Sequence, residues 1–330
     1  PELKTDDSAK TMFLLGLAIT SNGQEVYSNS LTAEEVYDYY KKNGKFPLRS
    51  YGTQGAAMVD AFQAANEMIE RWGLDTFAGF LNTKFTVEQL RALGFKIGGE
   101  NGEYETHGSL IFGPKVGGGF FQNLMGNYDP VTMDRWFMRT WGRLTGTLMP
   151  DQTQLPEGQK NRFVDAIKRD PKRVKELGWT VERATESDES LMEFAVLVHL
   201  AYQKSTSKYH GSYGEKTEIH KAGKQLDLSF NARGSQRMWI REVSALALEK
   251  LQQRGFPVNG ASMQALVWYP EKDLYLKHGV GNAKSAPTDY EQEFARIAKD
   301  RGVPQSRIDA ARTSDTQQPG PAAAIHPCWS

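Results

Sequence analysis

The amino-acid sequence predicts a mainly α fold, on three observations. Apolar residues recur at the spacing of a helix face along most of the 330-residue chain. Several of these segments open with a recognisable start signal, such as the capping box of Thr86 and Gln89. Alternation of apolar and polar residues, which marks strands, is scarce, and short extended pieces are expected only at Thr180–Arg183 and Leu226–Phe230.

The first expected helices lie in the N-terminal third of the chain. Thr32 and Glu35 form a capping box and predict a helix that begins there. Gln54–Trp72 predicts an amphipathic helix, and Gly73 supplies its stop. One face of that helix carries Met58, Phe62, Met68 and Ile69. The box at Thr86 predicts the next helix along the chain.

Further helices are expected at Glu189–Lys204, Gln236–Gln253 and Thr288–Arg301. Two segments interrupt the pattern: Gln152–Gln159, a connection that separates two lobes, and Ser205–Arg237, a long polar stretch. We therefore expect one helical domain over residues 1–312, with a C-terminal helical extension over 156–312. Residues 313–330 are polar, then rich in Pro and Ala, and are expected to form a weakly ordered tail.

Composition excludes several classes of protein. Forty basic residues balance forty acidic ones, so any nucleic acid must be held by a local basic surface. A single cysteine, Cys328, excludes intrachain disulfides and multi-cysteine metal sites, and no histidine pair has a metal-binding spacing. Met12–Ile19 is far shorter than the roughly 20 apolar residues that cross a bilayer. We expect no cofactor, no metal, no membrane and a cytoplasmic location, and the oligomeric state is open.

Two segments that contain aromatic residues each allow two interpretations. Lys204–Lys224 holds five lysines against two glutamates, with two tyrosines between them, and is either a solvated loop or an element that follows phosphates. Ser262–His278 contains Trp268, Tyr269 and Tyr275 around Pro270. It is favoured as a core helix with an exit turn at the proline, and a stacking surface is the alternative.

The segment Ser109–Thr145 is the part of the chain whose residue types look chosen for chemistry. Phe112–Lys115 is a turn that opens into three successive glycines, Gly117–Gly119. Small residues let another group approach the backbone closely, and a glycine-turned helix start offers free N–H groups to an anion. Asp129–Pro130 marks a second turn, after which Thr132–Thr145 is expected to be helical.

The expected helix at Thr132–Thr145 carries a stripe of like charge. Arg135, Arg139 and Arg143 follow at intervals of four residues and share one face. They repel one another unless an anion joins them, and either phosphates or buried carboxylates would serve. Asp134 lies at the helix start, where the structural reading is a capping residue. With Lys115 facing the same cleft, the pair would suit nucleophilic attack on an anomeric carbon.

These residues resemble the helix-hairpin-helix DNA glycosylase superfamily. The resemblance lies in Gly113–Gly117, in the apolar helix to Gly126, and in Val131–Arg139 with Arg143–Leu144. It covers about 37 residues, Ser109–Thr145, and the cysteine cluster of the iron–sulfur members is absent. The resemblance implies an all-helical, two-lobed fold in which DNA bends across the hairpin and a base flips into the cleft.

The resemblance also implies residue roles. Lys115 falls on the Schiff-base lysine of one branch, Asp134 on the aspartate found across the superfamily, and Arg139 on the arginine five residues later. DNA backbone contacts are expected at Gly113, Pro114, Gly117, Arg135, Arg139 and Arg143. Candidates for the base pocket are Trp136, Glu105 and His107. The expected activity is excision of a flipped base through its N-glycosidic bond.

Other functions stay open on the same scaffold. A phage-type enzyme of DNA hypermodification would use Asp134 and Lys115 while the glycosidic bond stays intact. A noncatalytic DNA-binding module would keep the fold without turnover. A toxin or phage accessory protein that uses the same pocket on a modified base or nucleotide is the third alternative.

Overall fold

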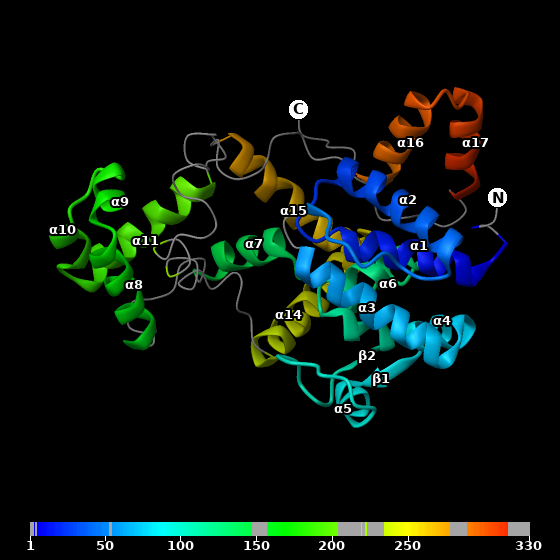
Figure 1. The fold of residues 1–330 in the computed structure, drawn as a ribbon, viewed down its shortest axis with the longest axis horizontal. Coiled ribbons are helices and arrows are strands. Elements are labelled where there is room, and N and C mark those ends of the chain that lie inside the picture. Colours follow the sequence, from blue (N-terminus) through cyan, green and yellow to red (C-terminus); the bar gives the residue numbers. More distant parts are fainter. Residues whose placement is uncertain are drawn as a thin grey trace. The chain divides into compact units, whose positions relative to one another are not determined.

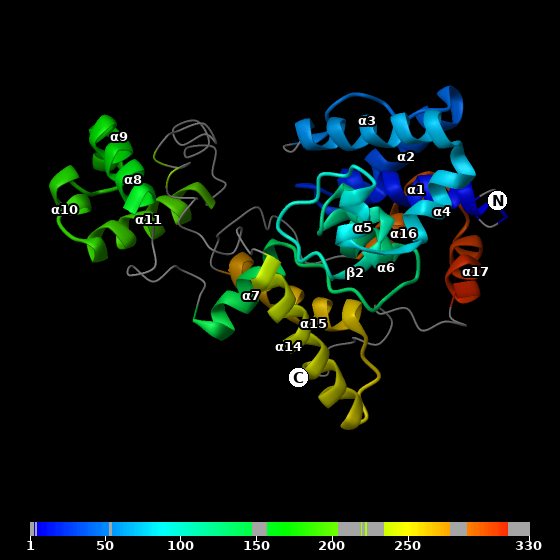
Figure 2. The same cartoon turned by 90° about the horizontal axis from the view of Figure 1, so that it is seen from below.

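The structure is a computed structural model that describes residues 3, 5–52, 55–146, 157–203, 219, 222, 234–277 and 289–315. Most of the described residues are helical, and the mainly α prediction is confirmed. The chain divides into two compact units (Figures 1 and 2). The first unit consists of Pro1–Met133, Arg233–Ala265 and Thr288–Ser330, and the second of Asp134–Ala232 and Leu266–Pro287.

Four helices lead the first unit: α1 Asp7–Thr20, α2 Val26–Asn43, α3 Gly55–Trp72 and α4 Leu74–Asn82. α1 begins where the Asp6 carboxylate accepts a hydrogen bond from the backbone N–H of Ala9, at 2.9 Å. α2 ends at Gly44, whose φ of 68° is a left-handed conformation that glycine adopts without strain. The buried side chains of α1 and α2 face one core with those of α3 and α4.

The loop after α2 closes this core. Phe46 is buried and its ring stacks on that of Phe62 in α3, with 5.2 Å between the centroids. Asn66, also in α3, accepts a hydrogen bond from the Phe46 N–H at 2.7 Å and donates one to the Phe46 carbonyl at 2.9 Å. One side-chain amide thus satisfies both backbone groups of a buried residue, which holds the loop on α3.

A small antiparallel sheet follows α4. Strand β1, Lys84–Thr86, pairs with β2, Glu105–His107, with Phe85 opposite Thr106. Between the strands lies α5, Val87–Ala92, whose capping box is formed by Thr86 and Gln89 as predicted. Beyond the sheet the first unit contains α6 Phe121–Leu124, α14 Gly234–Gln253, α16 Tyr290–Asp300 and α17 Gln305–Asp315.

Helix α16 packs against α2 in the first unit (Figure 1). The buried amide of Asn29 in α2 donates a hydrogen bond to the hydroxyl of Tyr290 at 2.8 Å, and another to the Leu17 carbonyl of α1 at 3.1 Å. Arg301, which ends α16, pairs with Glu34 of α2 at 2.6 Å. These contacts attach the C-terminal helices to the N-terminal ones, although more than 250 residues separate them in the chain.

The second unit contains α7 Arg135–Thr145, α8 Glu157–Arg169, α9 Pro171–Glu176, α10 Val181–Thr185 and α11 Asp188–Gln203. Helices α8 to α11 share a core in which Phe163, Ile167 and Phe194 are fully buried. Trp179, between α9 and α10, lies with its ring 5.5 Å from that of Phe194. Helix α15, Gly260–Lys277, gives its residues up to Ala265 to the first unit and the rest to the second.

Most of the expected helices are confirmed within the described residues, as α3, α11, α14 and α16. Three expectations are wrong. The helix expected from Thr32 begins at Val26, and the Thr32 hydroxyl donates to the Ser28 carbonyl inside that helix. Thr180–Arg183 is not extended, because Thr180 caps α10. Pro270 lies inside α15 and does not end it.

Several expected segments fall largely or wholly outside the described residues. Leu226–Phe230 and most of Ser205–Arg237 lie outside, as do residues 152–156 of the connection expected at Gln152–Gln159. The remaining residues of that connection, Glu157–Gln159, belong to helix α8, so the expectation is wrong there. Of the expected tail, residues 316–330 lie outside. Residues 313–315 belong to α17, so the helical part of the chain extends slightly past the predicted boundary at 312.

Candidate functional site

The glycine-rich segment is a compact set of turns in the first unit. A 3₁₀ turn, Gly108–Phe112, leads to Gly113, and a π-helical turn, Val116–Phe120, continues directly into α6. The buried hydroxyl of Ser109 donates to the Gly117 carbonyl at 2.6 Å and accepts a hydrogen bond from Gln122 at 2.9 Å. Helical structure at 116–124 follows the prediction, but it begins with a π-turn and ends after one α-helical turn.

The three glycines allow close approach, as predicted, and the approaching group is the chain itself. A Cβ at Gly117 would lie 1.6 Å from the Ser109 carbonyl oxygen, and one at Gly119 would lie 2.9 Å from the Cα of Thr132. Both glycines are buried. The expectation of free N–H groups here is wrong for Gly117 and Gly118, because both donate to the carbonyl of Gly113, at 2.9 and 3.1 Å.

Gly113, Pro114 and Lys115 form the outer part of this turn, and all three are half-buried. Gly113 has a φ of 95°, a conformation that favours glycine. Contacts of Gly113, Pro114 and Gly117 with DNA, and a nucleophilic role for Lys115, stay predictions.

Asp134 is the N-cap of α7, in the second unit. One carboxylate oxygen, Oδ1, accepts a hydrogen bond from the Phe137 N–H at 2.9 Å. The other, Oδ2, accepts one from the indole Nε1 of Trp268 in α15 at 2.7 Å. The capping role anticipated from the sequence is therefore present. The second bond fixes the plane of the carboxylate, because each oxygen is held by a different donor.

The arginines of the α7 stripe differ in burial: Arg139 lies in the interior, whereas Arg143 is partly exposed. Arg139 is only 1% exposed, and its guanidinium lies 4.9 Å from the ring centroid of Trp136. Arg143 makes a two-point contact with Glu271 of α15, at 3.1 Å from Nε and 2.8 Å from Nη2. The glutamate is almost fully buried. For Arg143 the joining anion is thus a buried carboxylate, one of the two alternatives that the sequence left open. Arg135 belongs to α7, and its side chain lies outside the described residues.

Aromatic and polar groups of α7 and α15 surround Asp134. Trp136 and Trp268 meet edge to face with 6.5 Å between centroids, and the ammonium of Lys272 lies 4.8 Å from the Trp268 ring. The Thr140 hydroxyl donates to the Val267 carbonyl at 2.9 Å. We call Asp134, Trp136, Arg139, Arg143, Trp268 and Glu271 the α7–α15 cluster. Pro270 has no N–H, so the regular helix bond to the Leu266 carbonyl is missing beside this cluster.

Trp268 and Glu271 are the members that sequence reasoning missed. The sequence places Trp268 in a core helix or a stacking surface and gives Glu271 no role. Their partners lie 134 and 128 residues away in the chain. No local pattern carries that information.

Glu105 and His107 lie on β2 in the first unit, where His107 is directly opposite Lys84 of β1. Burial lowers the pKa of His107, and the nearby positive charge of Lys84 lowers it further. Glu105 is exposed. The structure therefore brings together Asp134, Trp136, Arg139 and Arg143, whereas Lys115, Glu105 and His107 belong to the other unit.

One open hollow of about 450 Å³ lies in the first unit among α1, α2 and α16. None of the candidate catalytic, DNA-binding or base-pocket residues predicted from the sequence lines this hollow. Within the described residues, no three His, Cys, Asp or Glu side chains gather as a metal site would require. Every described helix is also too short or too polar to span a bilayer.

Comparison with known protein families, curated proteins and solved structures finds no match to this chain.

Proposed function

We propose that the protein is a DNA-acting enzyme that processes a flipped base, with Asp134 as its essential carboxylate. The observation that carries the proposal is the carboxylate held by the Phe137 N–H and the Trp268 indole beside two tryptophan rings. A fixed carboxylate stabilises positive charge that develops on a sugar as a glycosidic bond breaks. Tryptophan rings are surfaces on which an extruded base stacks.

The proposed reaction is base excision. The bond between C1′ and the base nitrogen breaks, the electron pair leaves with the base, and a nucleophile forms a new bond to C1′. That nucleophile is water or, following the resemblance, the uncharged amine of Lys115. Either nucleophile loses a proton on addition, and the departing base, which carries the electron pair, takes up a proton in its place. The carboxylate of Asp134 stays ionised throughout and lowers the energy of the oxocarbenium-like transition state.

A noncatalytic DNA-binding module is the second candidate, and one observation favours it. The charged groups of Asp134, Arg143 and Glu271 in the α7–α15 cluster have structural contacts: Asp134 caps a helix, and Arg143 pairs with buried Glu271. These structural contacts are a sufficient reason for the chain to have these residues at these positions, without any catalytic role. Base hypermodification and toxin activity on the same fold are the remaining alternatives, and they differ from excision in leaving the glycosidic bond intact or acting elsewhere.

The test compares wild type with Asp134→Asn on labelled duplexes that contain uracil or oxidised, alkylated or hydroxymethylated bases. Asparagine is as good an N-cap as aspartate, so α7 should still form. Asp289→Asn is the matched control, because Asp289 caps α16 through an equivalent bond to the Gln292 N–H at 2.7 Å. Released bases are identified by mass spectrometry, and covalent adducts are trapped with borohydride.

Release of a base by wild type and Asp289→Asn, with loss in a folded Asp134→Asn, supports excision. An adduct that disappears in Lys115→Ala assigns the nucleophile. If wild type binds the duplexes and neither releases nor modifies any base, the excision proposal fails and the binding module is favoured. A duplex base of altered mass that stays attached to its sugar points to hypermodification.

A further inference from the structure

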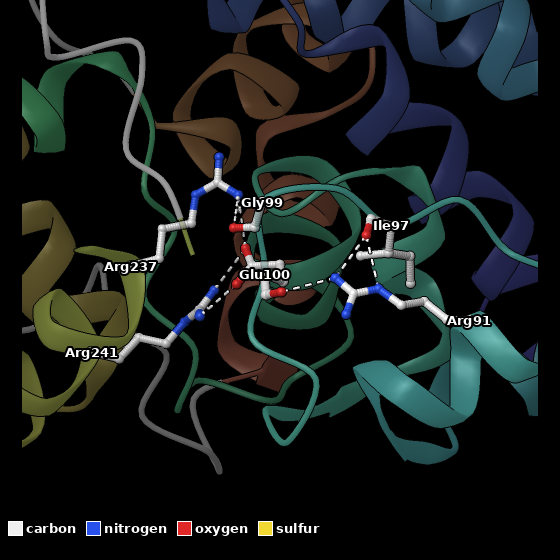
Figure 3. Close-up of polar contacts among 6 residues, drawn as sticks. All are labelled: Arg91, Ile97, Gly99, Glu100, Arg237 and Arg241. Atoms are coloured by element: carbon white, nitrogen blue, oxygen red, sulfur yellow. Dashed lines mark hydrogen bonds and ion pairs between the residues drawn. The ribbon is translucent and has the colours of Figure 1, made fainter. Parts of the chain in front are cut away.

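The glycine-containing loop Gly98–Gly102 of the first unit carries a buried carboxylate, that of Glu100. The side chain of Glu100 is completely buried. Its Oε1 accepts hydrogen bonds from Arg237 at 3.0 Å and from Arg241 at 3.2 Å, and its Oε2 accepts one from Arg241 at 2.8 Å. Figure 3 shows both guanidinium groups directed at Glu100 from α14. We call Glu100, Arg237, Arg241 and Arg91 the Glu100 cluster.

Arg91 reaches the same loop from α5. It donates to the Ile97 carbonyl through two nitrogens, at 3.1 and 2.9 Å, and to the Glu100 carbonyl at 2.9 Å. These acceptors are uncharged. The Glu100 cluster therefore holds three guanidinium charges and one carboxylate. Arg91 is exposed to solvent, whereas Arg237 and Arg241 are largely buried against the single carboxylate of Glu100. Because a buried charge is unfavourable unless an opposite charge compensates it, this pair of arginines favours a further anion.

The arginines are fixed in place before any ligand arrives. Arg241 makes a two-point contact with Glu100, and its guanidinium lies 3.7 Å from the ring centroid of Tyr104. Arg237 also donates to the Gly99 carbonyl at 3.1 Å. A Cβ at Gly99 would come within 3.2 Å of that arginine, so the glycine makes room for it. Groups held in this way lose little conformational freedom on binding.

Part of each arginine remains accessible. The side chains of Arg237 and Arg241 are 20% and 21% exposed. One terminal nitrogen of Arg237 points away from Glu100 in Figure 3, and within the described residues it has no hydrogen-bond acceptor. Holding α14 on the loop needs only one cation for the one carboxylate. The second cation and its outward N–H groups suit a ligand with oxygen acceptors and negative charge.

We propose that the Glu100 cluster is a phosphate-binding site, with Arg237 as the direct contact and Glu100 and Arg241 as positioning residues. The phosphate is either a backbone phosphate of DNA or a free phosphate ion. The DNA source rests on the proposed function, whereas the free-ion source does not.

The test has a phosphate arm and a DNA arm. In the first, thermal unfolding of wild type is measured in sodium phosphate and in sodium chloride at equal ionic strength and pH. In the second, affinity for a DNA duplex is measured over a range of salt concentrations. Both arms are repeated with Arg237→Gln and with Arg254→Gln. Arg254 directly follows α14, is exposed and carries the same charge, so its variant is the matched control.

The site predicts that phosphate raises the unfolding temperature of wild type and of Arg254→Gln, and that this shift is lost in Arg237→Gln. If DNA supplies the phosphate, the slope of log affinity against log salt falls by about 1 in Arg237→Gln and stays unchanged in Arg254→Gln. Equal shifts in all three proteins, or no phosphate shift in wild type together with equal DNA slopes, overturn the inference.

The outcomes separate this inference from the proposed function. A phosphate shift that depends on Arg237, in a protein that does not bind DNA, leaves the phosphate site standing and removes the proposed function. Base release that depends on Asp134, with no role for Arg237 in either arm, leaves the proposed function standing and removes the phosphate site. If Arg237→Gln fails to fold, the wild-type comparison of phosphate with chloride still tests the phosphate arm, because the absence of a shift there counts against the site.

Discussion

Alanine substitutions at the glycines of the π-helical turn test whether these glycines are needed for close internal packing. In Gly117→Ala, the new Cβ would lie 1.6 Å from the Ser109 carbonyl oxygen. Comfortable separations between such atoms are roughly 3.5 Å, so one backbone segment must move by roughly 2 Å. That shift also disturbs the buried bond from the Ser109 hydroxyl to the Gly117 carbonyl.

The magnitude follows from these two losses. Overpacking in a well-packed interior costs typically 1–3 kcal/mol, and a disturbed buried hydrogen bond adds about 1 kcal/mol. We expect Gly117→Ala to lower the free energy of unfolding by about 3 kcal/mol. In Gly118→Ala the nearest atom is the Leu110 Cδ1, at 2.8 Å, the end of a side chain that can rotate. Its effect should be smaller, about 1 kcal/mol.

Gly79 provides the matched control. It is exposed within α4, and nothing lies within 4 Å of a Cβ placed there. Alanine at such a helix position should stabilise the protein by about 0.5–1 kcal/mol. Urea denaturation of the three variants gives the free energies directly. A Gly117→Ala protein as stable as wild type would refute the view that this glycine exists for internal packing and would restore a ligand as the approaching group.

Three further predictions concern the α7–α15 cluster and the sheet. Arg143→Ala should destabilise the protein by about 3 kcal/mol, because it leaves the buried carboxylate of Glu271 without an opposite charge. Glu271→Gln should cost only about 1 kcal/mol, because the side chain of Arg143 is 44% exposed and reaches water. Equal losses of unfolding free energy in urea denaturation would contradict this asymmetry. Trp268→Phe should cost about 1–2 kcal/mol through the bond to Asp134, and a double-mutant cycle with Asp134→Asn should show coupling of at least about 0.5 kcal/mol; additive effects would mean that the bond contributes nothing. Because the pKa of His107 is lowered on folding, the unfolded chain takes up its proton more readily, so stability present above about pH 6.5 is lost as the pH falls below it. His107→Gln should flatten this dependence between about pH 7.5 and 5.5, and an unchanged slope would assign it to other groups.

Local signals in the sequence predict much of the fold. The capping box of Thr86 and Gln89 is present as expected, and the helices at 189–204 and 236–253 lie within two residues of their predicted bounds. The wrong expectations at Thr32 and Pro270 have a common cause: each residue type occurs in two different local structures, and the sequence pattern does not distinguish them. Threonine caps helices but also bonds back to a carbonyl within one, as Thr32 does. Proline usually ends a helix, but Pro270 is accommodated inside α15.

The candidate site is less predictable than the fold. The position of Asp134 at a helix start is a local property, and the sequence predicts it. Its bond to Trp268 and the pairing of Arg143 with Glu271 join segments more than 120 residues apart, which local spacing cannot encode. The sequence offered phosphate or a buried carboxylate as partners for the arginine stripe, and only packing chooses the carboxylate for Arg143.

The order of the segments in the two units affects how the protein responds to cutting. Each unit is made of segments that are separated in the sequence. The first unit combines residues up to Met133 with Arg233–Ala265 and Thr288–Ser330, and the second combines Asp134–Ala232 with Leu266–Pro287. A single protease cut between α7 and α8 therefore produces two fragments, neither of which contains a whole unit. Contacts within the first unit, such as Glu100 with Arg237 and Asn29 with Tyr290, would join the fragments across the cut. The cleaved protein should migrate as two bands under denaturing conditions and elute as one species under native conditions. Fragments made separately should be unstable alone and regain structure when mixed.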